Sequence, residues 1–226
     1  MRLRLLLLIA VMLVCYLLPW VINPGVSLTL GGYDLGEWAS LLDAVRGEQP
    51  PLLTSFLLRL PLALFALMIS FAALTPPLLF RRGGWGVRSS LGGEAISLKI
   101  LKIVLILLIT AALLPPLEIL DTPNDPNYRQ QVLLSMIALI GGMIGISGGL
   151  RRFHRLISIG ICVVGVLAII IGLTNAITLM RAFGLPSSVG AGGIFLAFLF
   201  TLNAVLMGLE ARRSFLPSPV SERGWG

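Results

Sequence analysis

Six long apolar segments constrain this chain more than any other feature of its sequence. The hydrocarbon core of a bilayer needs about 20 apolar residues per spanning helix, and each segment is close to that length. With 57% hydrophobic and 12% charged residues and a mean hydropathy of +0.97, the composition excludes a soluble enzyme or a disordered chain. We therefore predict an all-α integral membrane protein with six transmembrane helices, in one polytopic domain over residues 1–226. The spans are expected at residues 5–22, 61–80, 98–117, 132–150, 156–180 and 189–209.

Two of these segments allow an alternative interpretation. Residues 5–22 follow Arg2 and Arg4 and could be a secretory signal peptide, but no small-x-small cleavage site follows. We therefore expect a retained helix, with Pro19 and Trp20 at its far membrane interface. The second segment could start at residue 52, but Pro61 is well suited to a first helical turn. If the span starts at Pro61, Arg59 lies at the outer membrane interface. The alternative hypothesis is that Arg59 has a functional role.

Basic residues determine the expected orientation. With the amino terminus inside, 13 of the 17 Lys and Arg residues fall in inner segments and four, Arg46, Arg59, Arg129 and Arg181, fall outside. Cytoplasmic segments carry the excess of Lys and Arg, so both termini and the tail 211–226 are expected in the cytoplasm. The preference for Arg over Lys and the short loops favour the bacterial cytoplasmic (inner) membrane.

Glycine is unevenly distributed among the six spans. The first three contain none, whereas the last three contain 12 of the 25 glycines. Small residues let transmembrane helices approach closely, so the second half is expected to be the tightly packed half. We favour contacts within the subunit, with contacts to another protein as the alternative. The expected small-residue ridges, which resemble glycine zippers, contain Gly141, Gly145 and Gly149, then Ala168 and Gly172, then Gly193 and Ala197.

The longest outer loop, residues 23–51, contains a predicted amphipathic helix over about residues 35–46. Asp34 and Glu37 have the spacing of a capping box. The apolar residues that follow recur at helical spacing, so they share one face. We expect this face to cover the ends of neighbouring spans rather than to enter the lipid headgroups. The face consists of Trp38, Leu41, Leu42 and Val45.

Few residues within the spans have side chains that could take part in hydrogen bonding, metal binding or catalysis. Asn175 and Asn203 are expected to form two separate interhelical hydrogen bonds. The single histidine, His154, and the separated Cys15 and Cys162 have no spacing typical of a metal site. In the second outer loop, prolines explain Asp121 and its polar neighbours as turns better than as a calcium site. We therefore expect no catalytic residue, cofactor or metal.

Two functional hypotheses remain from these features. The first is a non-catalytic polytopic membrane subunit that packs in, or scaffolds, a larger prokaryotic membrane protein complex. The alternative is a small permease or substrate-binding membrane component for a neutral or lipophilic solute. In outline, six short-looped helices resemble the substrate-capturing component of energy-coupling-factor vitamin transporters. The expected partners are the lipid bilayer and other membrane-protein subunits. Nucleic acid is not expected, because the basic residues cluster at the ends of spans.

Overall fold

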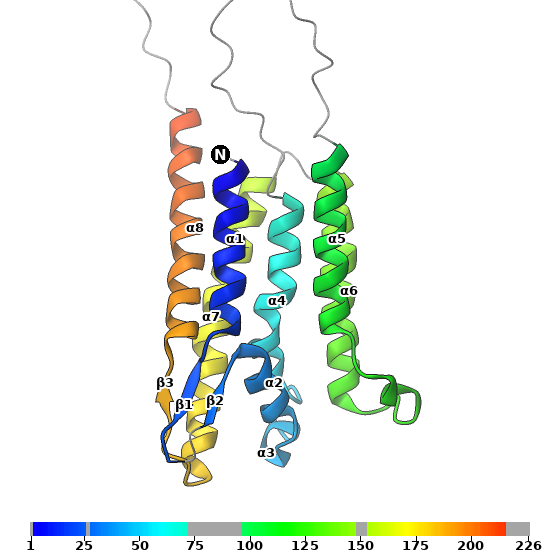
Figure 1. Ribbon diagram of the computed structural model, residues 1–226, viewed down its shortest axis with the longest axis vertical. Helices are drawn as coiled ribbons and strands as arrows, with labels where there is room; N and C mark the ends of the chain where they lie inside the picture. The colour runs from blue at the N-terminus through cyan, green and yellow to red at the C-terminus, as the bar shows by residue number, and fades with distance from the viewer. Residues whose placement is uncertain (1, 26–27, 72–95, 148–152, 216–226) are drawn as a thin grey trace, which may run out of the picture.

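The computed structural model describes residues 2–25, 28–71, 96–147 and 153–215, and this part is mostly helical (Figure 1). Four helices there are long and apolar enough to cross a membrane, which supports the expectation of a helical membrane protein. Two further helices, α1 (Arg2–Leu17) and α5 (Ile96–Leu113), lie beside them. The four are α4 (Leu53–Phe71), α6 (Pro126–Ser147), α7 (His154–Ala182) and the Ala191–Leu209 part of α8 (Ala191–Phe215).

The six long helices run alternately in opposite directions (Figure 1). One end of the bundle carries the short helices α2 (Gly32–Ser40) and α3 (Asp43–Arg46) and a three-stranded antiparallel sheet, in the order β2-β1-β3. We call these elements the cap, this end the cap end and the opposite end the far end. The 3-10 helix η2 (Leu117–Leu120) precedes α6. The strands are β1 (Val21–Asn23), β2 (Leu28–Leu30) and β3 (Ser188–Val189).

Helix α4 occupies the centre of the bundle and packs against α1, α2, α5, α6 and α7. It contains no glycine, and side chains project from it toward glycines of its neighbours. A Cβ on Gly141 would lie 2.3 Å from Leu67, and one on Gly145 would lie 2.0 Å from Ser70. The glycines of the second half therefore accept side chains from a helix of the first half, so close packing is shared between the halves.

The other expected ridge residues contact several helices. A Cβ on Gly172 would meet Leu58 of α4 at 3.3 Å, and one on Gly193 would meet Leu173 of α7 at 3.2 Å. Ala168 is buried and Ala197 is half-buried. Gly149 lies outside the described residues.

The start of α4 differs from the expectation that Pro61 begins this helix. It begins at Leu53, and Pro61 lies inside it. The Glu48 carboxylate accepts the backbone N–H of Thr54 at 2.7 Å, which satisfies a free amide of the first turn and carries a negative charge at the helix amino terminus. Within a packed bundle, the hydrogen bond that Pro61 cannot donate is tolerated.

The first span also ends earlier than expected. Helix α1 stops at Leu17, and Val21–Asn23 forms β1, which pairs with β2 and β3. The residue before a proline is disfavoured in the helical region, so Pro19 ends the helix. Trp20 is fully buried and its Nε1 donates to the Cys15 carbonyl at 3.2 Å, so its ring packs within the protein. Its position at the far membrane interface stays a prediction.

The predicted outer helix is present as two helices, α2 and α3, with a break at Leu41. The Asp34 carboxylate accepts the backbone N–H of Gly31 at 3.3 Å, so α2 begins before Asp34 instead of after it. As expected, α2 covers the end of a long helix, because it packs on α4. The fully buried side chains of α2 include Leu35 and Ala39, which are not part of the expected apolar face. Of the expected face, Val45 is buried, Trp38 and Leu42 are half-buried, and Leu41 is exposed.

The remaining helices differ from expectation mainly at their ends. Helix α6 begins at Pro126, earlier than expected, because the Asp125 carboxylate accepts the backbone N–H of Asn127 at 2.7 Å. Helix α5 ends at Leu113, before two prolines, and α8 continues to Phe215, into the expected tail. Residues 72–80, 148–150 and 216–226, on which parts of the expectation fall, lie outside the described residues.

Candidate functional site

A buried arginine lies at the junction of the cap and the bundle. Arg59 of α4 has no exposed surface, and its Nη2 lies 2.8 Å from Oε1 of Glu37 on α2. Its Nη1 donates to Oδ1 of Asn127 on α6 at 2.7 Å. Gln131 Nε2 lies 3.3 Å from the same Glu37 oxygen. We call these four residues the Arg59 cluster. The cap covers Arg59, so its side chain is buried within the protein, and its position at the outer membrane interface stays a prediction.

The close approach of α2 explains why Arg59 is covered. A Cβ on Gly36 would lie 3.0 Å from Cγ and 3.4 Å from Nε of Arg59, so the absence of a side chain there lets α2 lie on the arginine. Arg59 Nε has no hydrogen-bond partner within the described residues. Burial of a charge is costly unless it is paired, so Glu37 and Asn127 are what make this position tolerable.

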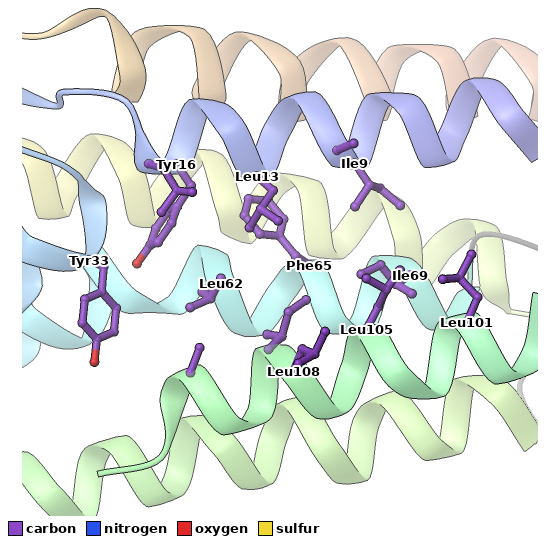
Figure 2. Close-up of a pocket in the computed structure, with 14 residues that line it drawn as sticks. Ile9, Leu13, Tyr16, Tyr33, Leu62, Phe65, Ile69, Leu101, Leu105 and Leu108 are labelled. Carbon is purple, nitrogen blue, oxygen red and sulfur yellow. The ribbon is translucent and has the colours of Figure 1, made fainter. Parts of the chain in front are cut away.

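A groove lies beside the cluster, between α1, α4 and α5. Helices α1 and α5 both pack on α4, and the groove between them encloses about 670 Å³ (Figure 2). The side chains that line it are apolar except for two tyrosines, Tyr16 of α1 and Tyr33 of α2. Leu13, Phe65 and Leu105 lie along its middle, one from each long helix. The sequence gives no sign of this groove, because hydropathy does not tell which faces of Leu-rich helices are covered.

The two tyrosines lie at the cap end of the groove (Figure 2). The buried Tyr16 hydroxyl donates to the Leu58 carbonyl at 3.1 Å. Tyr33 is half-buried and lies four residues before Glu37, so both residues share a face of α2. Burial, and next the negative charge of Glu37, raise the pKa of Tyr33 above its ordinary value. The Tyr33 hydroxyl is therefore protonated and neutral at physiological pH.

The two asparagines highlighted by the sequence lie in different parts of the bundle. Asn175 of α7 donates to Thr54 Oγ1 of α4 at 3.2 Å, and the Thr54 hydroxyl also hydrogen-bonds to Glu48. Asn203 of α8 lies 3.3 Å from Cys162 Sγ of α7. Each asparagine thus makes its own interhelical contact, and neither lines the groove.

Removal of the Thr54 hydroxyl is expected to destabilise the protein by about 1–3 kcal/mol, because it leaves Asn175 Nδ2 without its partner. Thr54→Val preserves the shape of the side chain, and denaturant unfolding in detergent measures its effect. The matched control is Thr178→Val on α7, where an exposed hydroxyl donates to the Thr174 carbonyl of its own helix. The control should stay within about 0.5 kcal/mol of the parent protein. Equal effects of the two substitutions would contradict a role for the Thr54 bridge.

Metal ligation has no support within the described residues, where no three His, Cys, Asp or Glu side chains gather in a group that could hold an ion. Asp125, a polar neighbour of Asp121 in the loop before α6, pairs with Arg46 at 3.4 Å and caps α6. No family model, curated protein or solved structure matches the chain. The Arg59 cluster and the groove are therefore the observations on which a functional proposal can be based.

Proposed function

We propose that this chain is a non-catalytic, substrate-binding membrane component, or small permease, for a lipophilic molecule that occupies the groove between α1 and α5. The observation that carries this proposal is the groove itself. Its volume of about 670 Å³ falls within the range of about 300–1,000 Å³ typical of small-molecule pockets. A mostly apolar wall with a few polar groups at one end is the usual composition of such a site.

The proposed topology has six transmembrane helices, both termini in the cytoplasm and the cap on the outer face of a bacterial inner membrane. The alternating directions of the six helices support it, since they place the starts of α1, α5 and α7 at one end (Figure 1). The thirteen-to-four distribution of basic residues supports the assignment of that end to the cytoplasm. In this orientation the groove, lined by residues along α1, α4 and α5, lies within the membrane, where a lipophilic molecule is most concentrated.

Blocking the groove is expected to abolish binding. Leu105 is half-buried and lines the middle of the groove, so Leu105→Trp fills the space that a ligand would occupy. The probe is a photoreactive long-chain alkane carrying a diazirine, added to the protein in lipid nanodiscs, with labelled peptides mapped by mass spectrometry. We expect labelling of the groove residues of α1 to fall at least about fivefold, since the site is sterically closed.

The matched control places the same residue on the same helix outside the groove. Leu107 is 51% exposed and does not line the groove, so Leu107→Trp should leave α1 labelling unchanged. Thermal unfolding of both variants reports whether the bundle is preserved. Labelling of α1 that is equal in the parent protein and in both variants would overturn the proposal.

The second candidate function is that of a packing or scaffolding subunit in a larger membrane complex. The observation that favours it concerns two glycines, Gly160 of α7 and Gly208 of α8, near the far end of neighbouring helices. A Cβ at either position would meet no atom of the described residues within 4 Å, so these glycines pack against no side chain in that part of the chain. Small residues on an open helix face suit close approach by a helix of another protein.

Copurification from native membranes tests this second candidate. The double variant Gly160→Leu/Gly208→Leu should lose the partner proteins that the parent protein retains in mild detergent, with its own unfolding temperature unchanged. A protein that runs only as an isolated monomer under these conditions would contradict a role as a subunit.

A further inference from the structure

The groove has a buried floor and exposed edges. Leu62, Phe65 and Ile69 of α4 form its floor, and all three side chains are buried. At the edges, Leu17 at the end of α1 and Leu108 of α5 are exposed. Because the described residues leave both edges exposed and the floor buried between them, a ligand reaches the floor from the side of the bundle, between α1 and α5.

The length of the groove matches the depth of one membrane leaflet. On α5 the lining extends from Leu101 to Ala112, which at about 1.5 Å per residue corresponds to roughly 16 Å. The hydrocarbon core of a bilayer is about 30 Å thick, so the groove covers about half of it. Ala112 lies next to the last residue of α5, so this half is the one at the cap end.

The floor gives the groove a direction. Its three residues follow one another at i, i+3 and i+7 along one face of α4, from the cap end toward the far end (Figure 2). An apolar body that covers this row lies parallel to the helices, as the acyl chains of a bilayer do.

The polarity of the lining places a head group outside the groove. The described residues that line it carry no charge, and the two polar ones, Tyr16 and Tyr33, both lie at the cap end (Figure 2). A charged group among the apolar side chains would be strongly disfavoured without a counter-charge. The polar part of an amphiphile therefore lies beyond the cap end, which is the membrane surface in the proposed topology.

From these observations we propose that the ligand is a membrane phospholipid of the leaflet at the cap end, with one acyl chain in the groove and its head group at the membrane surface. The acyl chain enters between α1 and α5 and lies along the floor with its end toward the far end. This inference rests on the proposed function, since it specifies the molecule that the same groove binds. It adds a source in the bilayer and a fixed orientation, which the proposed function alone does not require.

Three phosphatidylethanolamine probes test the orientation. Each carries one diazirine on an acyl chain, close to the head group, at mid-chain or at the chain end, and is added to lipid nanodiscs that hold the parent protein. Labelled residues are mapped by mass spectrometry. We expect the three probes to label Leu62, Phe65 and Ile69 respectively, since the floor residues follow one another in this order from the cap end. The reverse order would overturn the inference.

Labelling of the floor separates a chain in the groove from the lipids around the bundle. The floor is buried, whereas Phe198 of α8 is exposed and lies outside the groove. Leu105→Trp should lower labelling of the floor by the mid-chain probe at least about fivefold, by steric closure, and leave labelling of Phe198 unchanged. Leu107→Trp should change neither. Floor labelling that is equal in the parent protein and in Leu105→Trp would contradict a chain in the groove.

A substitution at the far end tests how deeply the chain extends. Leu101→Trp narrows this end alone, so labelling of Ile69 by the chain-end probe should be largely lost while labelling of Leu62 by the probe nearest the head group stays unchanged. The matched control is Ile100→Trp, because Ile100 is exposed on the same helix and does not line the groove. Equal loss at Ile69 and Leu62 in Leu101→Trp would contradict a chain ordered along the floor.

The outcomes separate the two proposals. If the diazirine alkane labels the groove and Leu105→Trp blocks it, but the phospholipid probes label exposed faces and not the floor, this inference fails and the proposed function stands. If neither the alkane nor the phospholipid probes label the groove, both fail. Ordered labelling of the floor that Leu105→Trp abolishes supports both.

Discussion

Replacement of Glu37 with alanine is expected to lower the free energy of unfolding by about 3–5 kcal/mol, because it leaves the Arg59 guanidinium buried without a counter-charge. Arg59 has no exposed surface, and the contacts that remain are Asn127 Oδ1 at 2.7 Å and the packing of α2. The cap must therefore lift away from α4, or the charge must stay in an apolar environment.

The converse substitution should cost less. The Glu37 side chain is 38% exposed, so in Arg59→Leu the carboxylate keeps much of its hydration and leucine fills part of the vacated space. Replacement of buried ionic groups with apolar residues is often close to neutral, so a cost within about 2 kcal/mol is expected. The double variant Glu37→Ala/Arg59→Leu should accordingly be more stable than Glu37→Ala alone.

Denaturant unfolding in detergent, followed by circular dichroism, measures all three variants. Asp43→Ala, which removes an exposed carboxylate at the start of α3, is the control and should cost no more than about 1 kcal/mol. If Arg59→Leu proves as damaging as Glu37→Ala, or if the double variant shows no recovery, the buried charge is not the source of the instability.

The sequence predicts the features of this protein that depend on local pattern. Apolar runs of spanning length indicate the helical membrane class, and the helical spacing in residues 35–46 indicates an outer helix covering the bundle. Both depend on neighbours a few residues apart. The end of α1 can also be predicted from neighbouring residues, because Pro19 disfavours the helical conformation in the residue before it. The pairing of β1 cannot be predicted in this way, since Val21 pairs with Val189, which is distant in the sequence.

The candidate site depends on contacts that local pattern does not contain. Arg59 and Asn127 are 68 residues apart in the chain, and Glu37 had already been explained by a capping role. The one available signal was an arginine beside a long apolar run, opposite an acidic outer helix. The groove likewise depends on which helices pack on α4, and composition alone does not distinguish the Leu-rich α4 at the centre from the Leu-rich α5 at the edge.

Among the glycines that the structure describes, Gly190 makes the closest approach to backbone atoms, so its replacement should have a large effect. A Cβ there would lie 2.3 Å from the carbonyl oxygen of Pro19 and 3.0 Å from the carbonyl carbon of Trp20. Its own N–H donates to the Trp20 carbonyl at 2.7 Å, at the point where β3 leads into α8. A side chain can rotate away from an added methyl group, but these backbone atoms cannot move without separating β1 from the start of α8.

Gly190→Ala should therefore destabilise the protein by about 3 kcal/mol or more, at the upper end of the cost of overpacking. Gly165→Ala should cost less, about 1–3 kcal/mol, because its Cβ meets the Phe200 ring at 2.8 Å and the ring can shift. Gly160→Ala, whose Cβ meets no atom of the described residues within 4 Å, should be neutral or stabilising by up to about 1 kcal/mol through helix propensity. Thermal unfolding of the three variants in one detergent gives the ranking. A Gly190→Ala protein as stable as Gly160→Ala would mean that the contact between β1 and the start of α8 is looser than the 2.7 Å hydrogen bond indicates.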